Sequence, residues 1–388
     1  MTAIKDMLAE QMRTRNESPA LIDATLKALR DDVLTIGFAR RFATYKRAHL
    51  LFMNEEKLKA LLNNSEKPVQ FIFAGKAHPH DKAGQDLIKR IIELSRRPEF
   101  IGKIVFVENY NMILAKKLVS GCDIWMNTPT RPLEASGTSG EKAVMNGVLN
   151  LSVLDGWWAE GYVPGAGWAL KEEITYQDNR LQDELDAEVL YNLIGEQISP
   201  AFYNRDEQGV PTEWVGMMKK CFMLISPHFT MKRQLDDYYN KFYHKLMNRY
   251  RKLSANDNDN VKVLLRWREH VLAAWHEIEC VGVDYTKNEK STYSVGERLE
   301  CRLDVRLGDL RPQDVKIELV FVTPDNHGKR PKLEFKVPFV FEVEHNGIYT
   351  FVSSKMAQRI GMWDCAVRVI PNHELLPHDQ DFNIVRWI

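Results

Sequence analysis

Four basic side chains lie close together near the amino terminus, and no acidic residue interrupts them. They are Arg40, Arg41, Lys46 and Arg47, within the stretch 37–47 (GFARRFATYKR). Unpaired cations are unfavourable unless an anion meets them, and guanidinium forks together with an ammonium group suit a phosphate. The stretch is therefore a candidate phosphate-binding site. A solvated basic turn is the alternative interpretation.

A second candidate segment, 134–142 (EASGTSGEK), combines two glycines with small hydroxyl residues. Its small residues allow the backbone to curl so that several N–H groups converge, and we expect a helix from about Lys142 onward. That combination suits a phosphate cradle. A lysine above such a cradle could hold pyridoxal phosphate as a Schiff base. A tight turn followed by an ordinary exposed lysine is the alternative.

Two further features follow expected strands. The segment 74–80 (AGKAHPH) places Lys76, His78 and His80 near one another, but no acidic or thiol partner lies at convincing ligand spacing. We therefore predict no metal site. Tyr110 follows another expected strand, where its hydroxyl group could reach a ligand, and core packing is the alternative.

Alternating strands and helices must position these segments. Apolar β-rich runs predict strands at 33–38, 69–73, 104–108, 122–126 and 149–154. Amphipathic stretches between them predict helices at 45–62, 84–94 and 112–119, and from 142 onward. This alternation predicts a doubly wound parallel α/β sheet, and ligands collect at the carboxyl ends of the strands in such sheets. All the candidate segments fall at those ends.

The rest of the chain predicts a second, different domain. Residues 1–32 are expected to be helical, residues 33–253 to form the α/β lobe, and 157–196, rich in Trp, Gly and acidic residues, to form irregular loops over the sheet. The polar stretch Ser254–Asn260 predicts a linker, followed by a helix up to residue 279. Period-two alternation over 280–388 predicts a small all-β domain, a sandwich.

Composition excludes several classes of protein. The 388 residues contain 53 basic and 53 acidic side chains, so we predict neither a nucleic-acid nor a membrane partner. No apolar run approaches the roughly 18 residues of a membrane span. The five cysteines are scattered, with no CxxC pair, so neither a disulfide framework nor a zinc site is indicated. We expect a reduced, cytoplasmic protein.

Taken together, the segments resemble the C-terminal half of the α-glucan phosphorylases, the glycogen and starch phosphorylase family, in its shorter bacterial and archaeal branch. The matching runs are 35–48 (TIGFARRFATYKRA), 73–79 (FAGKAHP), 108–110 (ENY), 131–140 (RPLEASGTSG) and 146–158 (NGVLNLSVLDGWW). The resemblance implies the C-terminal lobe of a GT-B glycosyltransferase that carries pyridoxal 5'-phosphate. Residues 1–32 would then lead in from an amino-terminal lobe.

The resemblance also implies residue roles. In this family the cofactor aldehyde forms a Schiff base with the lysine that matches Lys142, and the cofactor phosphate relays a proton to the substrate phosphate. Arg41 and Lys46 match residues that bind substrate phosphate. The positions that match cofactor contacts are Arg40, Tyr110, Gly137, Thr138 and Ser139. Those that match contacts to the transferred glucose are Tyr45, Glu134, Ser136 and Gly137.

The implied reaction is phosphorolysis of an α-1,4-glucan by inorganic phosphate, which releases glucose 1-phosphate without a hydrolase-type carboxylate pair. Two departures stand out. Glu141 occupies a position where the family has methionine, and it either faces out or opposes the cofactor phosphate. The amino-terminal lobe, which carries the other wall of the sugar pocket, is missing, so a separate lobe chain is a candidate partner, and a homo-oligomer is expected.

Two other classes of function stay open. The first is a truncated, catalytically silent homologue that binds the cofactor or a partner. The second is a glucan-binding module, which would depend on the β domain and the pair Trp157-Trp158.

Overall fold

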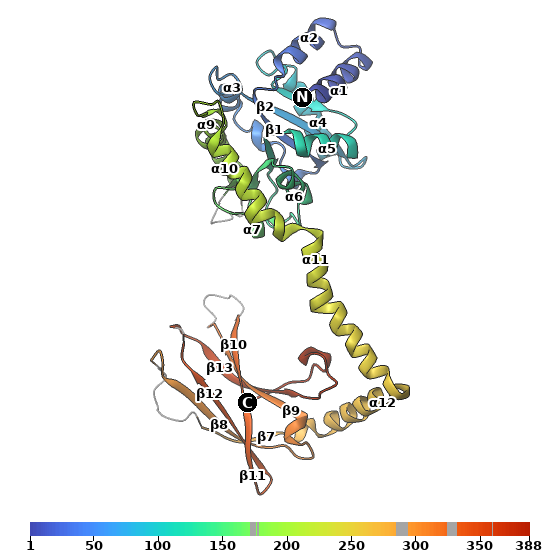
Figure 1. Ribbon diagram of the computed structural model, residues 1–388, viewed down its shortest axis with the longest axis vertical. Helices are drawn as coiled ribbons and strands as arrows, with labels where there is room; N and C mark the ends of the chain where they lie inside the picture. The colour runs from blue at the N-terminus through green and yellow to red at the C-terminus, as the bar shows by residue number, and fades with distance from the viewer. Residues whose placement is uncertain (171–175, 177, 285–293, 324–331, 359) are drawn as a thin grey trace. The chain divides into compact units, whose positions relative to one another are not determined.

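The computed structural model describes residues 1–170, 176, 178–284, 294–323, 332–358 and 360–388. These residues divide into two compact units, Met1–Asp236 and Asp237–Ile388 (Figure 1). No helix among the described residues is long and apolar enough to cross a membrane.

The first unit is built on a parallel sheet whose described strands follow the order β3-β2-β1-β4-β5-β6. The strands are β1 Leu34–Phe42, β2 Val69–Ala77, β3 Ile104–Val107, β4 Ile124–Asn127, β5 Leu149–Val153 and β6 Trp168–Leu170. This is the strand order of a doubly wound sheet. The chain adds strands toward one edge from β1 to β3 and toward the other edge from β4 onward, so the strand order reverses between β1 and β4. The predicted parallel α/β architecture is confirmed.

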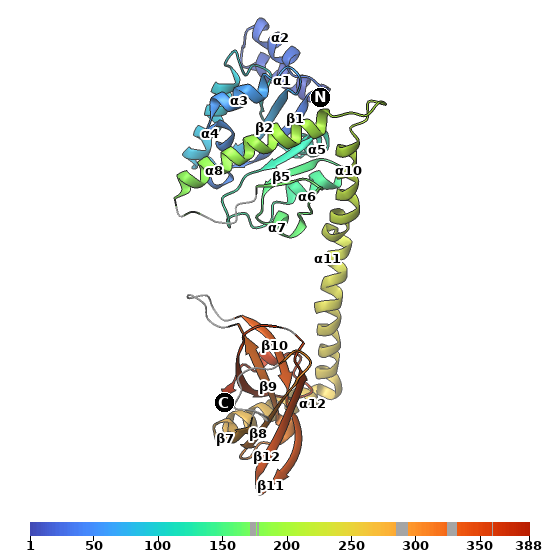
Figure 2. The same cartoon turned by 90° about the vertical axis from the view of Figure 1, so that its left-hand side faces the viewer.

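Helices cover both faces of this sheet because successive strand residues alternate between two apolar cores. Phe38 and Phe73 lie in one core with residues of α3, α4 and α8, and Ala39 and Ala74 lie in the other with residues of α1, α5 and α6. Figure 2 shows α8 lying along one face of the sheet. The helices of this unit are α1 Thr2–Thr14, α2 Pro19–Ala28, α3 Glu55–Leu62, α4 Lys82–Ser95, α5 Met112–Gly121, α6 Thr138–Met145, α7 Trp157–Gly161, α8 Asn179–Asn192, α9 Ser199–Tyr203 and α10 Thr212–Lys220. Helix α11 Met231–Tyr238 includes the boundary between the two units in the sequence.

Three sequence predictions for this unit are wrong. The helix expected over 45–62 consists of the 3-10 turns Thr44–Lys46 and Leu50–Phe52 and then α3, because Arg47 takes a left-handed conformation (φ 50°) that ends the first turn. Helix α6 begins at Thr138, so Lys142 lies in its last turn and not at its start. The region 157–196 is not irregular, since its described part contains α7, β6 and α8.

Strand β1 also runs further than the sequence predicts, so that it contains both Arg40 and Arg41. Gly75 of β2 is paired in register with Arg40, and the two backbones come close at this point. A Cβ atom at Gly75 would lie 2.0 Å from the Arg40 carbonyl oxygen and 2.6 Å from the Phe42 ring. Neither neighbour can move without disturbing the sheet.

We therefore expect Gly75→Ala to lower the free energy of unfolding by roughly 2–4 kcal/mol, because β1 and β2 must separate locally. Urea denaturation measures the effect. Gly216→Ala is the matched control, since a Cβ atom at this position in α10 meets nothing within 4 Å. It should be neutral or stabilise by up to about 1 kcal/mol through helix propensity. Equal effects of the two substitutions would contradict the packing explanation.

The second unit contains α12 His244–Ala274 and two antiparallel sheets of described strands, ordered β10-β9-β13-β14 and β11-β12-β8-β7. The strands are β7 Glu279–Asp284, β8 Arg298–Arg306, β9 Val315–Val322, β10 Leu333–Pro338, β11 Val340–His345, β12 Ile348–Met356, β13 Asp364–Pro371 and β14 Arg386–Trp387. Buried residues of both sheets share one apolar core with α12, as in a sandwich. The backbone leaves helical geometry at 255–258, inside the polar stretch that predicted a linker.

Candidate functional site

The point where the strand order reverses brings basic and polar side chains together. Arg40, near the end of β1, donates to the Asn127 side chain at the end of β4 and to the Met126 carbonyl oxygen at 3.2 Å. Its side chain is buried, and its Nε has no hydrogen-bond partner among the described residues. Burial lowers the pKa of Arg40 to about 10, although the nearby Glu134 carboxylate acts in the opposite direction.

A buried ion pair lies beside Arg40. The Lys46 ammonium group contacts the Glu134 carboxylate, and it lies 4.7 Å from the centre of the Tyr45 ring. Arg40 Nη1 lies 3.9 Å from the same carboxylate oxygen. Two buried cations therefore face one buried carboxylate, which leaves one positive charge in excess. That excess favours an additional anion.

Arg41 supplies a third cation, and it is exposed. No hydrogen bond or ion pair engages its guanidinium group within the described part of the chain. Its neighbour in the register of β1 and β2 is Lys76, which is exposed as well. The Arg41 side chain is therefore available to bind a solvent-borne anion.

Arg47, unlike Arg41, is not a free cation. The sequence places it in a run without acids, but α8 brings the carboxylates of Asp183 and Asp186 to within 2.9 Å and 2.6 Å of its guanidinium nitrogens. Its side chain is buried in these contacts. Carboxylates so distant along the chain could not be paired with Arg47 from the local sequence alone.

The loop before α6 is held by the residues that follow β5. Asp155 accepts the Glu134 N–H at 2.9 Å, and the Trp157 N–H donates to the Ser136 carbonyl at 2.8 Å. Gly137 precedes the helix with φ 85°, a conformation that suits glycine. These contacts fix the loop in a single curled path.

The first turn of α6 contains Thr138, Ser139 and Gly140, and Ser139 Oγ accepts the indole N–H of Trp125 at 3.1 Å. A Cβ atom at Gly140 would lie 2.7 Å from Trp157 Nε1, so a larger residue does not fit there. The first N–H groups of a helix have no partner within the helix and favour an anion. Together with the unpartnered Arg40 Nε, this turn fits a cofactor phosphate.

Lys142 and Glu141 differ in exposure. Lys142 is exposed, and no described residue pairs with its amine, whereas Glu141 is only partly exposed. Burial raises the pKa of Glu141, the Lys142 charge lowers it, and the Glu160 charge raises it further. An anionic cofactor beside Glu141 would therefore meet a carboxyl group that already resists ionisation.

Tyr110 shows the core packing that the sequence left open as one of two interpretations. It packs against the apolar core formed by α1, α5 and β3, and it is only partly buried. Burial raises the pKa of its hydroxyl group, and the Arg40 charge opposes that shift.

The remaining candidate residues are exposed or partly exposed. Ser136 is exposed, and Tyr45 is partly exposed with its carbonyl bonded to the Thr130 N–H at 2.7 Å. Lys76, His78 and His80 are exposed on and after the end of β2. The described residues contain no group of three or more side chains able to hold a metal ion.

Sequence reasoning missed Asn127, the acceptor for Arg40, and Asp155, which holds the cradle loop. Each is a polar residue directly at or after the end of a buried strand, β4 or β5. Ligand-facing positions in open α/β sheets occur at such ends, so this placement was a usable signal.

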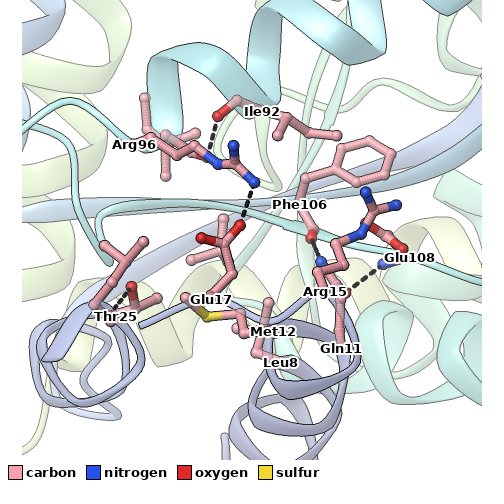
Figure 3. A pocket seen from close by; sticks show the side chains of 14 residues that line it. Leu8, Gln11, Met12, Arg15, Glu17, Thr25, Ile92, Arg96, Phe106 and Glu108 are labelled. Atoms are coloured by element: carbon pink, nitrogen blue, oxygen red, sulfur yellow. Dashed lines mark hydrogen bonds and ion pairs between the residues drawn. The ribbon is translucent and has the colours of Figure 1, made fainter. Parts of the chain in front are cut away.

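A pocket elsewhere in the first unit is separate from this site. Figure 3 shows it between α1, α2, α4 and β3, with Leu8, Met12 and Phe106 among the apolar residues that line it. Its charged side chains pair with one another: Arg15 with Glu108 at 2.7 Å, and Arg96 with Glu17. The pocket contains none of the predicted site residues.

The fold and the site define a parallel α/β protein with a candidate anion-binding site where its strand order reverses. Comparison with known proteins agrees with this class. Residues 8–160 match the model of the carbohydrate phosphorylase family, and residues 275–388 match the model of the glycogen phosphorylase C-terminal domain. The chain belongs to the carbohydrate phosphorylase family.

Individual relatives carry related names. The chain is 35% identical over 391 residues to a maltodextrin phosphorylase of Thermococcus litoralis, which covers 98% of the chain and 44% of the relative. It is 48% identical over 244 residues to a glycogen phosphorylase of Aquifex aeolicus, covering 63% of the chain and 35% of the relative. A glycogen phosphorylase of Mycobacterium tuberculosis is 35% identical over 395 residues, an alignment that covers 98% of the chain and 45% of the relative. The chain thus spans less than half the length of these relatives.

Proposed function

We propose that this chain supplies the cofactor and phosphate half of an α-glucan phosphorylase. The reaction is phosphorolysis of an α-1,4-glucan such as glycogen, starch or maltodextrin, which releases glucose 1-phosphate. The names of the relatives support the reaction. The observation that carries the proposal is the excess positive charge around Arg40, Lys46 and Glu134, beside the first turn of α6. The parallel sheet would then be the C-terminal lobe of a GT-B glycosyltransferase.

The residues would divide the work as follows. Pyridoxal 5'-phosphate, when bound, supplies a phosphate group that exchanges a proton with the substrate phosphate. Arg41 and Lys46 bind the substrate phosphate, and Arg40 with the first turn of α6 offsets the charge of the cofactor phosphate. Close phosphates repel one another unless cations lie between them, so this arrangement lowers the cost of holding both.

Glu134 and its neighbours would hold the transferred glucose. A buried carboxylate beside Lys46 can accept hydrogen bonds from sugar hydroxyls once phosphate takes over part of the Lys46 charge. The centre of the Tyr45 ring lies 4.7 Å from the Lys46 ammonium group, and a Cβ atom at Gly137 would lie 3.6 Å from the Glu134 carboxylate. Ser136, between Glu134 and Gly137 in the sequence, completes the proposed glucose contacts. Tyr110 would contact the cofactor ring, a role that the family resemblance implies.

The proposed function requires a second lobe. The relatives are more than twice as long as the part of them that this chain matches. An amino-terminal lobe, corresponding to the part of the relatives that this chain does not match, would supply the second wall of the sugar pocket. A cytoplasmic location and assembly into a homo-oligomer are part of the same proposal.

One observation favours a second candidate, a catalytically silent homologue. Glu141 is partly buried one residue before Lys142, and burial raises the pKa of its carboxyl group. In its ionised form this group would repel the phosphate of a cofactor bound nearby. A chain that has lost catalysis could tolerate such a carboxyl group. Cofactor content and turnover, considered in the Discussion, separate the two candidates.

Binding of inorganic phosphate tests the proposed function directly. We expect Arg41→Ala to weaken phosphate binding about tenfold or more, because a charge-assisted bond to the anion is lost. Cofactor content should change little, since α6 and Arg40 form its cradle. Isothermal titration with phosphate and absorbance of bound pyridoxal measure the two quantities.

Arg13→Ala is the matched control, because Arg13 is an exposed arginine of α1 outside the site. It should leave phosphate affinity unchanged. If Arg41→Ala behaves in the same way, the basic run is a solvated turn and the phosphate role of Arg41 is wrong.

A further inference from the structure

Arg47 has an unusual backbone and a fully engaged side chain. It is 3% exposed, and its φ of 50° and ψ of 44° place it in the left-handed region, which residues other than glycine seldom adopt. Such a conformation persists when surrounding contacts over-determine it. The contacts of the Arg47 side chain are of that kind.

The guanidinium group connects three separate segments. Nε donates to the Thr128 carbonyl at 2.9 Å, and Nη2 donates to the Pro129 carbonyl at 3.0 Å. Nη1 and Nη2 also pair with Asp183 and Asp186 of α8 at 2.9 Å and 2.6 Å. The loop that carries Arg47 is thereby bound both to the loop after β4 and to α8.

The two acidic partners are themselves held in place. Asp183 Oδ2 lies 2.8 Å from His49 Nε2, and Asp186 Oδ1 accepts the Gln182 side-chain amide at 3.0 Å. A planar fork that meets two carbonyls and two carboxylates at once cannot be reproduced by an ammonium group. The network is therefore specific for arginine.

The same segments carry the ion pair of the candidate site. Lys46 directly precedes Arg47, and the loop after β4 leads to Glu134. Two further bonds join the loops, from Thr128 Oγ1 to the Lys46 carbonyl at 3.2 Å and from the Thr130 N–H to the Tyr45 carbonyl at 2.7 Å. The distance between Lys46 and Glu134 thus depends on how these loops are held.

We propose that Arg47, with Asp183 and Asp186, is a positioning residue that keeps the Lys46 ammonium group inside the site. We call the contacts of Arg47 with Asp183, Asp186 and the loop after β4 the clamp. Without it, the long and flexible lysine side chain turns toward solvent, and the Lys46 charge no longer faces the phosphate position. The placement of Lys46 follows from the contacts alone. Its consequence for phosphate binding rests on the proposed function.

The reactivity of the Lys46 amine tests the placement without any assumption about function. The full chain is pulsed with acetic anhydride, and acetylation of each lysine is measured by peptide mass spectrometry. We expect Lys46 to react at least tenfold faster in Arg47→Lys and in Asp186→Asn than in the unmodified chain. Lys59, exposed on α3, should react equally in all samples.

Phosphate affinity is measured on the same proteins, and it should fall at least fivefold in Arg47→Lys. Circular dichroism at the assay temperature shows which variants are folded. Asp183→Asn is a milder substitution, because it leaves the other three contacts of Arg47 in place. If folded Arg47→Lys and Asp183→Asn both leave Lys46 acetylation unchanged, the positioning role is wrong.

Lys46→Ala separates this proposal from the proposed function. Unchanged phosphate affinity in Lys46→Ala would contradict the phosphate role of Lys46, whereas faster acetylation of Lys46 in Arg47→Lys would still support the clamp. Weakened affinity in Lys46→Ala, with unchanged affinity and acetylation in Arg47→Lys, would overturn the clamp alone.

Discussion

Replacing Lys142 with alanine should abolish the borohydride-reducible pyridoxal adduct without unfolding the chain. The amine lies in α6, and the N–H groups of Thr138 and Ser139 at the start of this helix favour a phosphate. It is exposed, and no described side chain pairs with it, so it is free to condense with an aldehyde. Since α6 keeps its apolar contacts through Ala143 and Val144, the free energy of unfolding should change by less than about 1 kcal/mol.

The measurement is absorbance of the reconstituted protein, followed by reduction and peptide mapping. Lys59→Ala is the control and should retain the adduct, because Lys59 lies on α3, outside the site. Glu141→Met should retain or increase cofactor content, since it removes the partly buried carboxyl group beside Lys142. An adduct mapped to a lysine other than Lys142 would contradict the assignment.

The sequence predicts the sheet well because each strand is a short buried apolar run between turn signals. Runs such as 69–73 and 104–108 correspond to β2 and β3, with errors only at their ends. The missed strands have weaker patterns. Strand β6 has only three residues, and the six residues of β7 are all exposed or partly exposed, without a strong apolar alternation. Tertiary pairing, and not local preference, decides such strands.

The candidate site was harder to predict because its contacts join distant parts of the chain. The position of Arg40 near a strand end was predictable, but its partner Asn127 lies on another strand. The pairing of Lys46 with Glu134 and of Arg47 with Asp186 depends on the three-dimensional path of the loops. The sequence shows four basic residues with no acidic residue among them. Only the fold shows which of these charges are neutralised by carboxylates from distant segments.

Helix boundaries are also difficult to predict from the sequence. The pattern after residue 45 is apolar at helical spacing, yet left-handed Arg47 divides it, and Asn54 then caps a new helix by accepting the Lys57 N–H. The sequence predicts the start of α6 four residues too late, because Thr138, Ser139 and Gly140 have the composition of a loop. Small residues at a helix start are common where the backbone packs closely, as Gly140 does against Trp157.

Turnover by this chain alone should be at least about a hundredfold slower than turnover in the presence of an amino-terminal lobe. Arg41, Ser136, Thr138 and Lys142 are exposed, so the reacting groups would face water on one side. Charge interactions weaken several-fold when a buried site becomes solvated, and a half-open site holds neither phosphate nor glucan in the reacting geometry. The expected defect is therefore in kcat as well as in KM.

The assay is release of glucose 1-phosphate from maltodextrin and inorganic phosphate, after reconstitution with pyridoxal 5'-phosphate. The added lobe is the part of the Thermococcus litoralis maltodextrin phosphorylase that this chain does not match, since that relative aligns with 98% of the chain. Lys142→Ala with the same lobe is the control and should stay inactive. Robust turnover by the chain alone would overturn the half-site interpretation. Adduct formation at Lys142 with no turnover even after lobe addition would instead favour the catalytically silent homologue, because the cofactor cradle would then be present without the catalysis it serves.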